Sequence, residues 1–309
     1  MARAVFKKSF FHPRYWSLWL AMGVLWLLIQ LPFKWLKKLG AGIGRFLYYF
    51  AKSRRDIALR NLELCFPNMT EQERILIVKR NFAAMGIAFF EMAISWWWPK
   101  RKFAKLAKKV DGFEYLQEAH EAGQGVLLMS LHFTTLEIGA ALLSTLYPMN
   151  GMYRQHKNAF FDYIQRAGRE TYNLEGEAIE REDIKTMLKV MRSGGTIWYA
   201  PDQDYGAKQS IFVPLFGVSA ATVTATSKFA RLGKAKVIPF VQKPLDDGSG
   251  YHLIIYPPLD DFPSDSEKVD CLRINQWVEK CVIEQVDQYL WAHRRFKTRP
   301  AGETSLYKK

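Results

Sequence analysis

The sequence predicts an α/β fold with a mostly parallel central sheet flanked by helices, preceded by an N-terminal hydrophobic membrane-anchor helix. Two observations favour the sheet. From about residue 110 onward, apolar runs of strand length alternate with segments of helical periodicity. The chain has 309 residues, of which 49% are hydrophobic, so it is long enough for one or two domains with a sizeable core. A third observation, the almost uninterrupted apolar run of residues 15–31, predicts the anchor.

This N-terminal run has the composition of a membrane anchor. Spanning a bilayer takes ~20 apolar residues, with a range of about 17–25, so the run is at the short limit. Tyr15, Trp16 and Trp35 flank it, as aromatic residues do at membrane interfaces. Basic residues are more numerous after it, which would place the body of the protein in the cytoplasm if the run spans. An interfacial anchor and a soluble core helix are the alternatives.

We divide the chain into an anchor over residues 1–35, a helical membrane-proximal region over 36–109 and an α/β core over 110–309. In the helical region, a helix is expected over residues 33–50. Thr70 and Glu73 have the spacing of a capping box, so a second helix should begin there and run to about Ser95. The three tryptophans at 96–98 indicate either a membrane-facing patch or core packing, since successive helical residues cannot all face one core.

The α/β core is predicted from alternating strands and helices. Strands are expected over residues 126–131, 151–153, 196–200, 236–242 and 251–256. Helices are expected over residues 113–122, 135–146, 158–170, 182–192, 220–232 and 268–288. A glycine- and aspartate-rich segment at 246–250 separates the last two strands and is typical of a hairpin turn.

The most informative segment for function begins at His132, directly after the apolar run 125–131. Open α/β sheets bind ligands at the carboxyl ends of their strands. An imidazole needs a carboxylate or carbonyl at its second nitrogen to fix its tautomer. A turn after His132, followed by a helix from about Thr134 or Thr135, would bring Glu137 back to it as that carboxylate. The alternative is a strand-end histidine satisfied by a backbone carbonyl, with Glu137 solvated.

Other polar residues follow the neighbouring predicted strands. Tyr153 and Arg154 follow one of them, and the planar guanidinium suits a phosphate or an oxyanion, with a surface ion pair as the alternative. Asp202 and Asp204 follow another, where they would position the site, join an ion-pair network or simply form a turn. The basic segment 293–299 is a solvated or membrane-apposed face, or a docking site for an anionic partner.

Several classes of protein are disfavoured. The sequence lacks a GxSxG elbow, a GxxxxGK[ST] loop and a GxGxxG after a strand, so serine hydrolase and nucleotide sites are not indicated. The three cysteines and the histidines have no metal-ligand spacing, so we expect neither a metal nor a disulfide. The net charge of +14 favours anionic partners. The basic residues are scattered and form no nucleic-acid-binding motif, so nucleic acid is not among the expected partners.

Six segments together resemble the late acyltransferases of lipid A biosynthesis, in the lysophospholipid acyltransferase superfamily, and most closely their lauroyl-transferring branch. The segments are residues 12–16, 61–67, 131–137, 198–206, 212–216 and 293–300. His132 and Glu137 match the family's His-x4-Asp/Glu motif, with Glu where the superfamily more often has Asp. The superfamily's Pro-Glu-Gly block is here the tripeptide at 201–203, which contains Asp202.

The resemblance implies transfer of a fatty acyl chain, lauroyl in that branch, from acyl carrier protein to a hydroxyl. The acceptor would be a 3-hydroxyacyl chain of a phosphorylated, Kdo-bearing lipid A precursor, at the cytoplasmic face of a Gram-negative inner membrane. Acyl carrier protein would be a co-substrate, with no cofactor, and membrane lipids would be further partners. His132 would act as general base and Glu137 would orient it. The substrate-binding residues would be Tyr153, Arg154, Asp202 and Asp204.

Two other enzymes would share the His–Glu pair. A glycerolipid (lysophospholipid) acyltransferase would acylate a different acceptor, and a thioesterase would release free fatty acid. A non-enzymatic membrane-binding protein is the third alternative.

Overall fold

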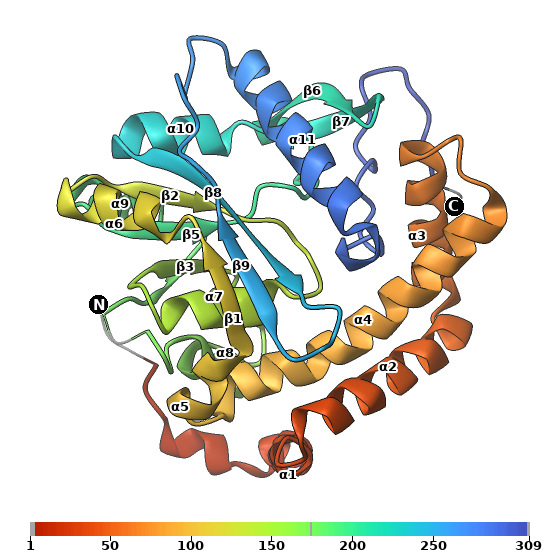
Figure 1. Ribbon diagram of the computed structural model, residues 1–309, viewed down its shortest axis with the longest axis vertical. Helices are drawn as coiled ribbons and strands as arrows, with labels where there is room; N and C mark the ends of the chain where they lie inside the picture. Colours follow the sequence, from red (N-terminus) through yellow and green to blue (C-terminus); the bar gives the residue numbers. More distant parts are fainter. Residues whose placement is uncertain (1–3, 174, 308–309) are drawn as a thin grey trace.

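A seven-stranded sheet forms the centre of the computed structural model, which describes residues 4–173 and 175–307 (Figure 1). Its strands are β1 (Ala107–Asp111), β2 (Val126–Met129), β3 (Asn150–Tyr153), β4 (Ala178–Glu180), β5 (Thr196–Tyr199), β8 (Lys236–Pro244) and β9 (Tyr251–Ile255). They lie in the order β1-β9-β8-β2-β5-β3-β4. Every pair is parallel except β8 with β9, which the predicted hairpin joins. The predicted mostly parallel sheet is therefore confirmed.

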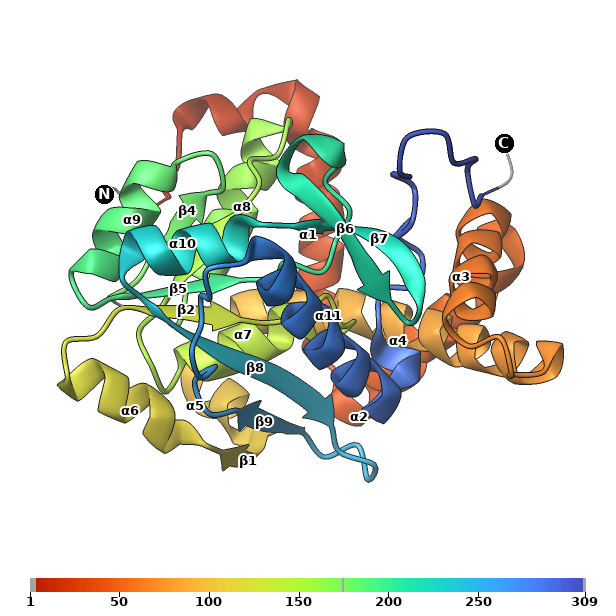
Figure 2. The same cartoon turned by 90° about the horizontal axis from the view of Figure 1, so that it is seen from above.

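Eleven α-helices lie within the described residues. They are α1 (Trp16–Leu28), α2 (Phe33–Phe50), α3 (Lys52–Cys65), α4 (Glu71–Trp97), α5 (Lys100–Phe103), α6 (Phe113–Glu121), α7 (Leu136–Ser144), α8 (Ala159–Arg169), α9 (Ile184–Arg192), α10 (Ala225–Gly233) and α11 (Glu267–Glu284). Helices α9 and α10 lie on one side of β2 and β5, while α6 and α7 lie on the other (Figure 2).

The alternation of side chains in β2 explains these two layers. Leu127 and Met129 belong to the core that α9, α10 and α11 cover, whereas Val126 and Leu128 belong to the core that α6, α7 and α4 cover. Successive side chains of a strand point to opposite faces, and both faces of a parallel sheet are buried. A continuous apolar run is therefore the pattern expected of this strand.

Two predicted helices begin or end elsewhere. The segment at 220–223 belongs to β7 (Val218–Val223), which pairs antiparallel with β6 (Ser210–Leu215), so α10 begins only at Ala225. The β-branched residues of this segment suit a strand better than a helix. The last long helix stops at Glu284, and a short 3-10 turn at Val286–Gln288 follows it.

Helix α4 begins with the predicted capping box. The Thr70 amide donates to the Glu73 carboxylate at 2.7 Å, and the Glu73 amide donates to the Thr70 hydroxyl at 3.3 Å. Helix α2 runs beside α4 along the outer edge of the molecule (Figure 1). Gly40 and Gly44 allow this close approach, because a Cβ on either would overlap the backbone of α4.

The tryptophans at the end of α4 are core residues. Trp96 and Trp98 are 2% and 4% exposed, and the Trp98 indole N–H donates to the Ile29 carbonyl at 2.8 Å. The membrane-facing patch predicted as one alternative is thus wrong for these two side chains. Because the helix ends at Trp97 and Trp98 has extended backbone, the three rings do not follow one helical surface.

The apolar N-terminal run forms α1, which packs against α4. Within residues 4–173 and 175–307, no helix has the combined length and apolarity needed to cross a bilayer.

Candidate active site

The parallel pairing of β2 with β5 creates the centre of the site. Met129 lies opposite Tyr199 in this pairing, and His132 and Asp202 each follow their strand by three residues. The imidazole Nδ1 of His132 lies 2.6 Å from Oδ1 of Asp202. The His132 main-chain amide donates to the other oxygen of that carboxylate at 3.0 Å. Two hydrogen bonds to one carboxylate therefore fix both the backbone and the ring of His132.

The protonation states follow from this geometry. Burial alone would raise the pKa of Asp202, but His132 and its two hydrogen bonds hold that pKa below its usual value. An ionised carboxylate only accepts hydrogen bonds, so Nδ1 is the donor and Nε2 carries the lone pair of the neutral imidazole. The His132 side chain is 21% exposed and lines an open cleft, so this nitrogen is suited to accept a proton from a ligand.

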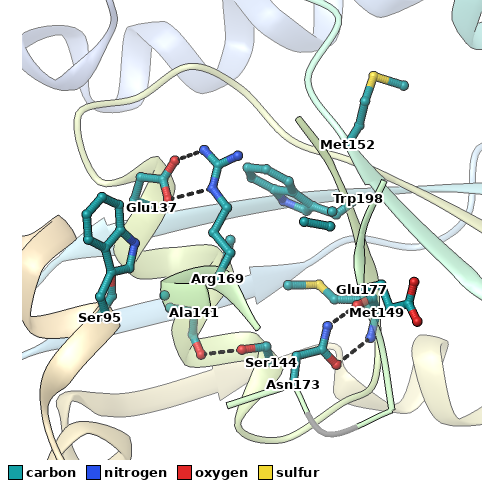
Figure 3. A pocket seen from close by; sticks show the side chains of 15 residues that line it. Ser95, Glu137, Ala141, Ser144, Met149, Met152, Arg169, Asn173, Glu177 and Trp198 are labelled. Atoms are coloured by element: carbon teal, nitrogen blue, oxygen red, sulfur yellow. Dashed lines mark hydrogen bonds and ion pairs between the residues drawn. The ribbon is translucent and has the colours of Figure 1, made fainter. Parts of the chain in front are cut away.

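Glu137 does not occupy the position predicted for it. Its carboxylate forms a two-point ion pair with Arg169, in which Nε lies 3.1 Å from Oε2 and a second guanidinium nitrogen contacts the other oxygen (Figure 3). The expected contact of Glu137 with Nδ1 of His132 is thus replaced by Asp202. The reason is that α7 begins at Leu136, which places Glu137 in the first helical turn beside α8.

Asp204 holds the end of the chain against the site. Its carboxylate accepts hydrogen bonds from the Thr298 amide and hydroxyl, both at 2.8 Å, and from the Gly206 amide at 2.9 Å. Its own amide donates to Nε2 of His293 at 3.2 Å. Burial, with help from Lys297, lowers the pKa of His293 to about 4, so this imidazole is a neutral acceptor. Asp204 thus joins two segments beside the cleft, and among residues 4–173 and 175–307 it forms no ion pair with an arginine, which was one alternative for it.

Part of the segment 293–299 is also built into the protein. Arg295 is 4% exposed and donates to the Ala221 carbonyl at 2.9 Å. The prediction that segment 293–299 forms a solvated or membrane-apposed face is therefore wrong for Arg295. Lys297, in contrast, lines the cleft together with His132.

The cleft has a volume of about 560 Å³ and is lined by more basic than acidic side chains, although Arg181 pairs with Glu182 at 3.1 Å. It lies at the carboxyl ends of β2, β3 and β5. Its lining residues include Tyr153, Arg154, Arg169, Arg181, Gln203, Asp204, Tyr205 and Lys297. The predicted residues Tyr153 and Arg154 are therefore brought together with His132. Arg154 is exposed and forms no ion pair with a carboxylate of the described residues. The alternative considered for it, a surface ion pair, is therefore not observed.

Two cations of this cleft were not predicted. Arg169 closes α8 and meets Glu137 from 32 residues away, so no local spacing marks it. Arg181 directly follows β4, a strand of three residues that the sequence did not reveal. Arg181 follows β4 just as Arg154 follows β3. A prediction of β4 would therefore have identified Arg181 as a second arginine at the carboxyl end of a strand.

A second, narrower pocket lies behind the Glu137–Arg169 pair (Figure 3). Its volume is about 40 Å³. Its wall includes Trp96, Ala140, Ala141, Ser144, Met149, Gly168 and Asn173. Arg169, Met152 and Trp198 line both this pocket and the cleft, so the two are neighbours. The ion pair thus stands between a polar cleft and a mostly apolar pocket.

Comparison with known proteins gives the family. The model of the bacterial lipid A biosynthesis acyltransferases matches residues 3–298. The chain belongs to this family. Among lipid A biosynthesis acyltransferases of Escherichia coli (strain K12), the lauroyltransferase is 43% identical over 98% of both chains. The palmitoleoyltransferase is 39% identical over 98% of both chains. The myristoyltransferase is 34% identical over 98% of this chain and 94% of its own.

These relatives are all lipid A acyltransferases, and they match nearly the full length of the chain. The lauroyltransferase match supports the predicted lauroyltransferase branch. A solved structure, the 1-acyl-sn-glycerophosphate acyltransferase of Thermotoga maritima, aligns with a TM-score of 0.39 and 14% identity. The alignment covers 82% of this chain and 99% of that one.

Proposed function

We propose that this lipid A acyltransferase moves a fatty acyl chain from acyl carrier protein to the hydroxyl of a 3-hydroxyacyl chain on a Kdo-bearing lipid A precursor. The hydrogen bond between His132 and Asp202 is the observation that carries the proposal. It leaves Nε2 as a base at the edge of a cleft large enough for a substrate. The lauroyltransferase from Escherichia coli, at 43% identity, supports lauroyl as the group transferred.

In the proposed reaction, Nε2 of His132 removes the proton of the acceptor hydroxyl as its oxygen attacks the thioester carbonyl. The tetrahedral intermediate collapses, the carbon–sulfur bond breaks and the acyloxyacyl ester forms. The imidazolium returns its proton to the leaving thiolate. Asp202 stabilises the imidazolium in between, through the charge-assisted hydrogen bond at Nδ1. A thioester is activated enough for direct transfer, so the mechanism needs no acyl-enzyme.

The cations of the cleft have a role in this scheme. Arg154, Arg181 and Lys297 would bind the phosphates of the lipid acceptor or the oxyanion of the intermediate. Arg154 is our first candidate, because it is exposed in the cleft and follows the strand β3 directly. A cationic cleft also suits the approach of an acidic carrier protein.

We assign Glu137 a positioning role. Its two-point contact holds the Arg169 side chain at the boundary between cleft and pocket. We place the first carbons of the donor acyl chain in that pocket, past Met152. The volume of about 40 Å³ is too small for a whole acyl chain, which enters only if side chains move aside. Methionine side chains, such as Met149 and Met152, rearrange easily.

The enzyme would work at the cytoplasmic face of the inner membrane, held by an interfacial anchor. Helices α1 and α2 carry apolar side chains that are 39% to 71% exposed. On α2 they form a stripe of Trp35, Leu39, Ile43, Phe46 and Phe50, and on α1 they are Trp16, Leu20, Val24, Trp26 and Leu27. The spacing of the α2 stripe places it on one side of that helix, while Leu36 and Gly44 pack inward. Helix α1 is apolar around most of its circumference. One-sided stripes are typical of helices that lie in the interface.

A mass-resolved transfer assay tests the proposed reaction. Purified wild type and His132→Ala are given acyl carrier proteins loaded with chains of different length and a Kdo-bearing tetra-acylated precursor. We expect a product heavier by one acyl group with wild type alone. Release of free fatty acid without a heavier lipid would instead establish a thioesterase, and acylation of an added lysophospholipid would establish a glycerolipid acyltransferase.

A further inference from the structure

A second cationic pocket lies between α2 and α4, and it shares no lining residue with the candidate active site. Its volume is about 260 Å³. It is lined by Arg45, Tyr48, Tyr49, Leu76, Lys79, Arg80 and Ala83. The proposed acyl transfer uses none of these residues. The pocket therefore needs a separate explanation.

The positive charge of this pocket is not neutralised by the protein. Arg45, Lys79 and Arg80 are all exposed, and within the described part of the chain none of them forms an ion pair with a carboxylate. Lys79 instead lies over the ring of Tyr48, with Nζ 5.6 Å from the ring centroid. Three exposed cations around a hollow with an aromatic wall attract an anion, and tyrosine hydroxyls can donate to its oxygens.

The position of the pocket on α2 indicates where this anion comes from. Tyr49 lines the pocket and is 61% exposed. On the same helix, Phe46 and Phe50 stack with their ring centroids 4.3 Å apart and belong to the exposed apolar stripe of α2. Tyr49 follows Arg45 by four residues and Phe46 by three, so on the helix surface it lies between the cation and the apolar stripe. A basic edge beside an apolar stripe matches the headgroup and acyl layers of a bilayer.

We propose that this pocket binds the phosphate of an anionic phospholipid while the α2 stripe enters the acyl-chain layer of the same membrane. The inference does not depend on the reaction chemistry, because neither the pocket nor the stripe includes a residue of the cleft. It specifies both a lipid class and an orientation: α2 lies along the membrane surface. An acidic carrier protein fits this pocket less well, because the neighbouring stripe offers it apolar rings in place of hydrogen-bond partners.

Vesicle binding by the full-length protein tests the proposal. Wild type is mixed with phosphatidylcholine vesicles that contain or lack phosphatidylglycerol, and bound protein is measured by flotation. The test variant is Arg45→Gln/Lys79→Gln/Arg80→Gln. We expect it to lose the preference for phosphatidylglycerol by about tenfold or more, since each basic residue near an anionic surface contributes to binding. Binding to phosphatidylcholine alone, which depends on the stripe, should not change.

The matched control, Lys185→Gln/Lys189→Gln/Lys268→Gln, removes the same charge from exposed residues of α9 and α11. An equal loss of lipid preference in both triple variants would overturn the proposal, as would a test variant that behaves like wild type. A test variant that keeps its lipid preference but no longer binds apo acyl carrier protein would assign the pocket to the carrier. Acyl transfer to detergent-solubilised acceptor should stay at the wild-type level in the test variant. Failure of wild type in that transfer assay would refute the proposed reaction and leave the vesicle result standing.

Discussion

Asp202 binds His132 through both of its carboxylate oxygens, one at the imidazole Nδ1 and the other at the main-chain amide. The two residues are 70 positions apart in the chain and are brought together by the pairing of β2 with β5. The carboxylate that is near in sequence, Glu137, is bound by Arg169 instead.

Replacement of His132 by Ala should abolish most acyl transfer. Removal of a general base usually lowers the rate by ~10²–10⁴, and we expect a loss of this order in kcat. The circular-dichroism spectrum should stay that of wild type, because the ring is partly exposed at the edge of the cleft. Near-normal turnover by the variant would exclude His132 as the base.

Asp202→Asn and Glu137→Gln separate the two carboxylates. The Asn amide still reaches the His132 backbone but no longer stabilises an imidazolium, so kcat should fall by roughly 10²–10⁴ with little change in KM. Glu137→Gln should lower activity less, and Arg169→Gln should have a similar effect. Steady-state kinetics of the three variants measure this order. If Glu137→Gln is the more damaging change and Asp202→Asn is mild, the orienting role belongs to Glu137.

The Glu137–Arg169 pair should behave as one unit in stability. Each side chain is 23% exposed, so either single change to Gln leaves a partly buried charge without its partner. We expect the double variant to be more stable than the sum of the single losses predicts, with a coupling of about 0.5–3 kcal/mol. Chemical denaturation of wild type, both single variants and the double variant gives this coupling. Strictly additive losses would show that the pair contributes no mutual stabilisation.

Ala141→Leu tests the placement of the acyl chain. Ala141 lines the narrow pocket beside Ser144 (Figure 3), and a larger side chain there fills its limited space. We expect a preference for shorter acyl donors, seen as a change in the ratio of kcat/KM values between donor lengths. Lys185→Gln, on the exposed surface of α9, is the control and should keep the wild-type ratio. An unchanged ratio in Ala141→Leu would place the chain elsewhere.

Glu91 should make the stability of the protein depend on pH. This side chain is 4% exposed and accepts a hydrogen bond from the Tyr251 hydroxyl. Burial raises its pKa to about 7, against the opposing effects of Tyr251 and Lys37. The folded state therefore binds the proton more tightly than the unfolded chain. The resulting stability is fully present below the unfolded pKa of about 4.3 and is lost as pH rises through about 7.

Glu91→Gln should remove this dependence, because the amide stays neutral and still accepts from Tyr251. Relative to wild type, the variant should gain about 3 kcal/mol in free energy of unfolding between about pH 4.5 and about pH 8. Denaturation at several pH values measures the difference. A constant difference between variant and wild type across this range would mean that Glu91 is charged in the folded protein.

Much of the fold could be predicted because its patterns are local. The helix expected at 33–50 coincides with α2, and the strands at 126–131 and 196–200 contain β2 and β5. The strands that the sequence did not reveal are short or lie at edges. β4 has three residues, and β1 has exposed lysines in its middle, so neither carries the apolar run that a buried strand requires. β6 and β7 lie outside the main sheet altogether.

From the sequence alone we could predict that His132 follows a buried strand, that Arg154 follows a second strand and that Asp202 and Asp204 follow a third, because strand periodicity and strand ends are local properties. The partner of His132, in contrast, depends on how the chain folds. The choice between Glu137 and Asp202 depends on the register that sets Met129 opposite Tyr199, and on the helix start that turns Glu137 toward Arg169. Register and helix packing result from burial across the whole sheet, so spacing along the chain does not contain them.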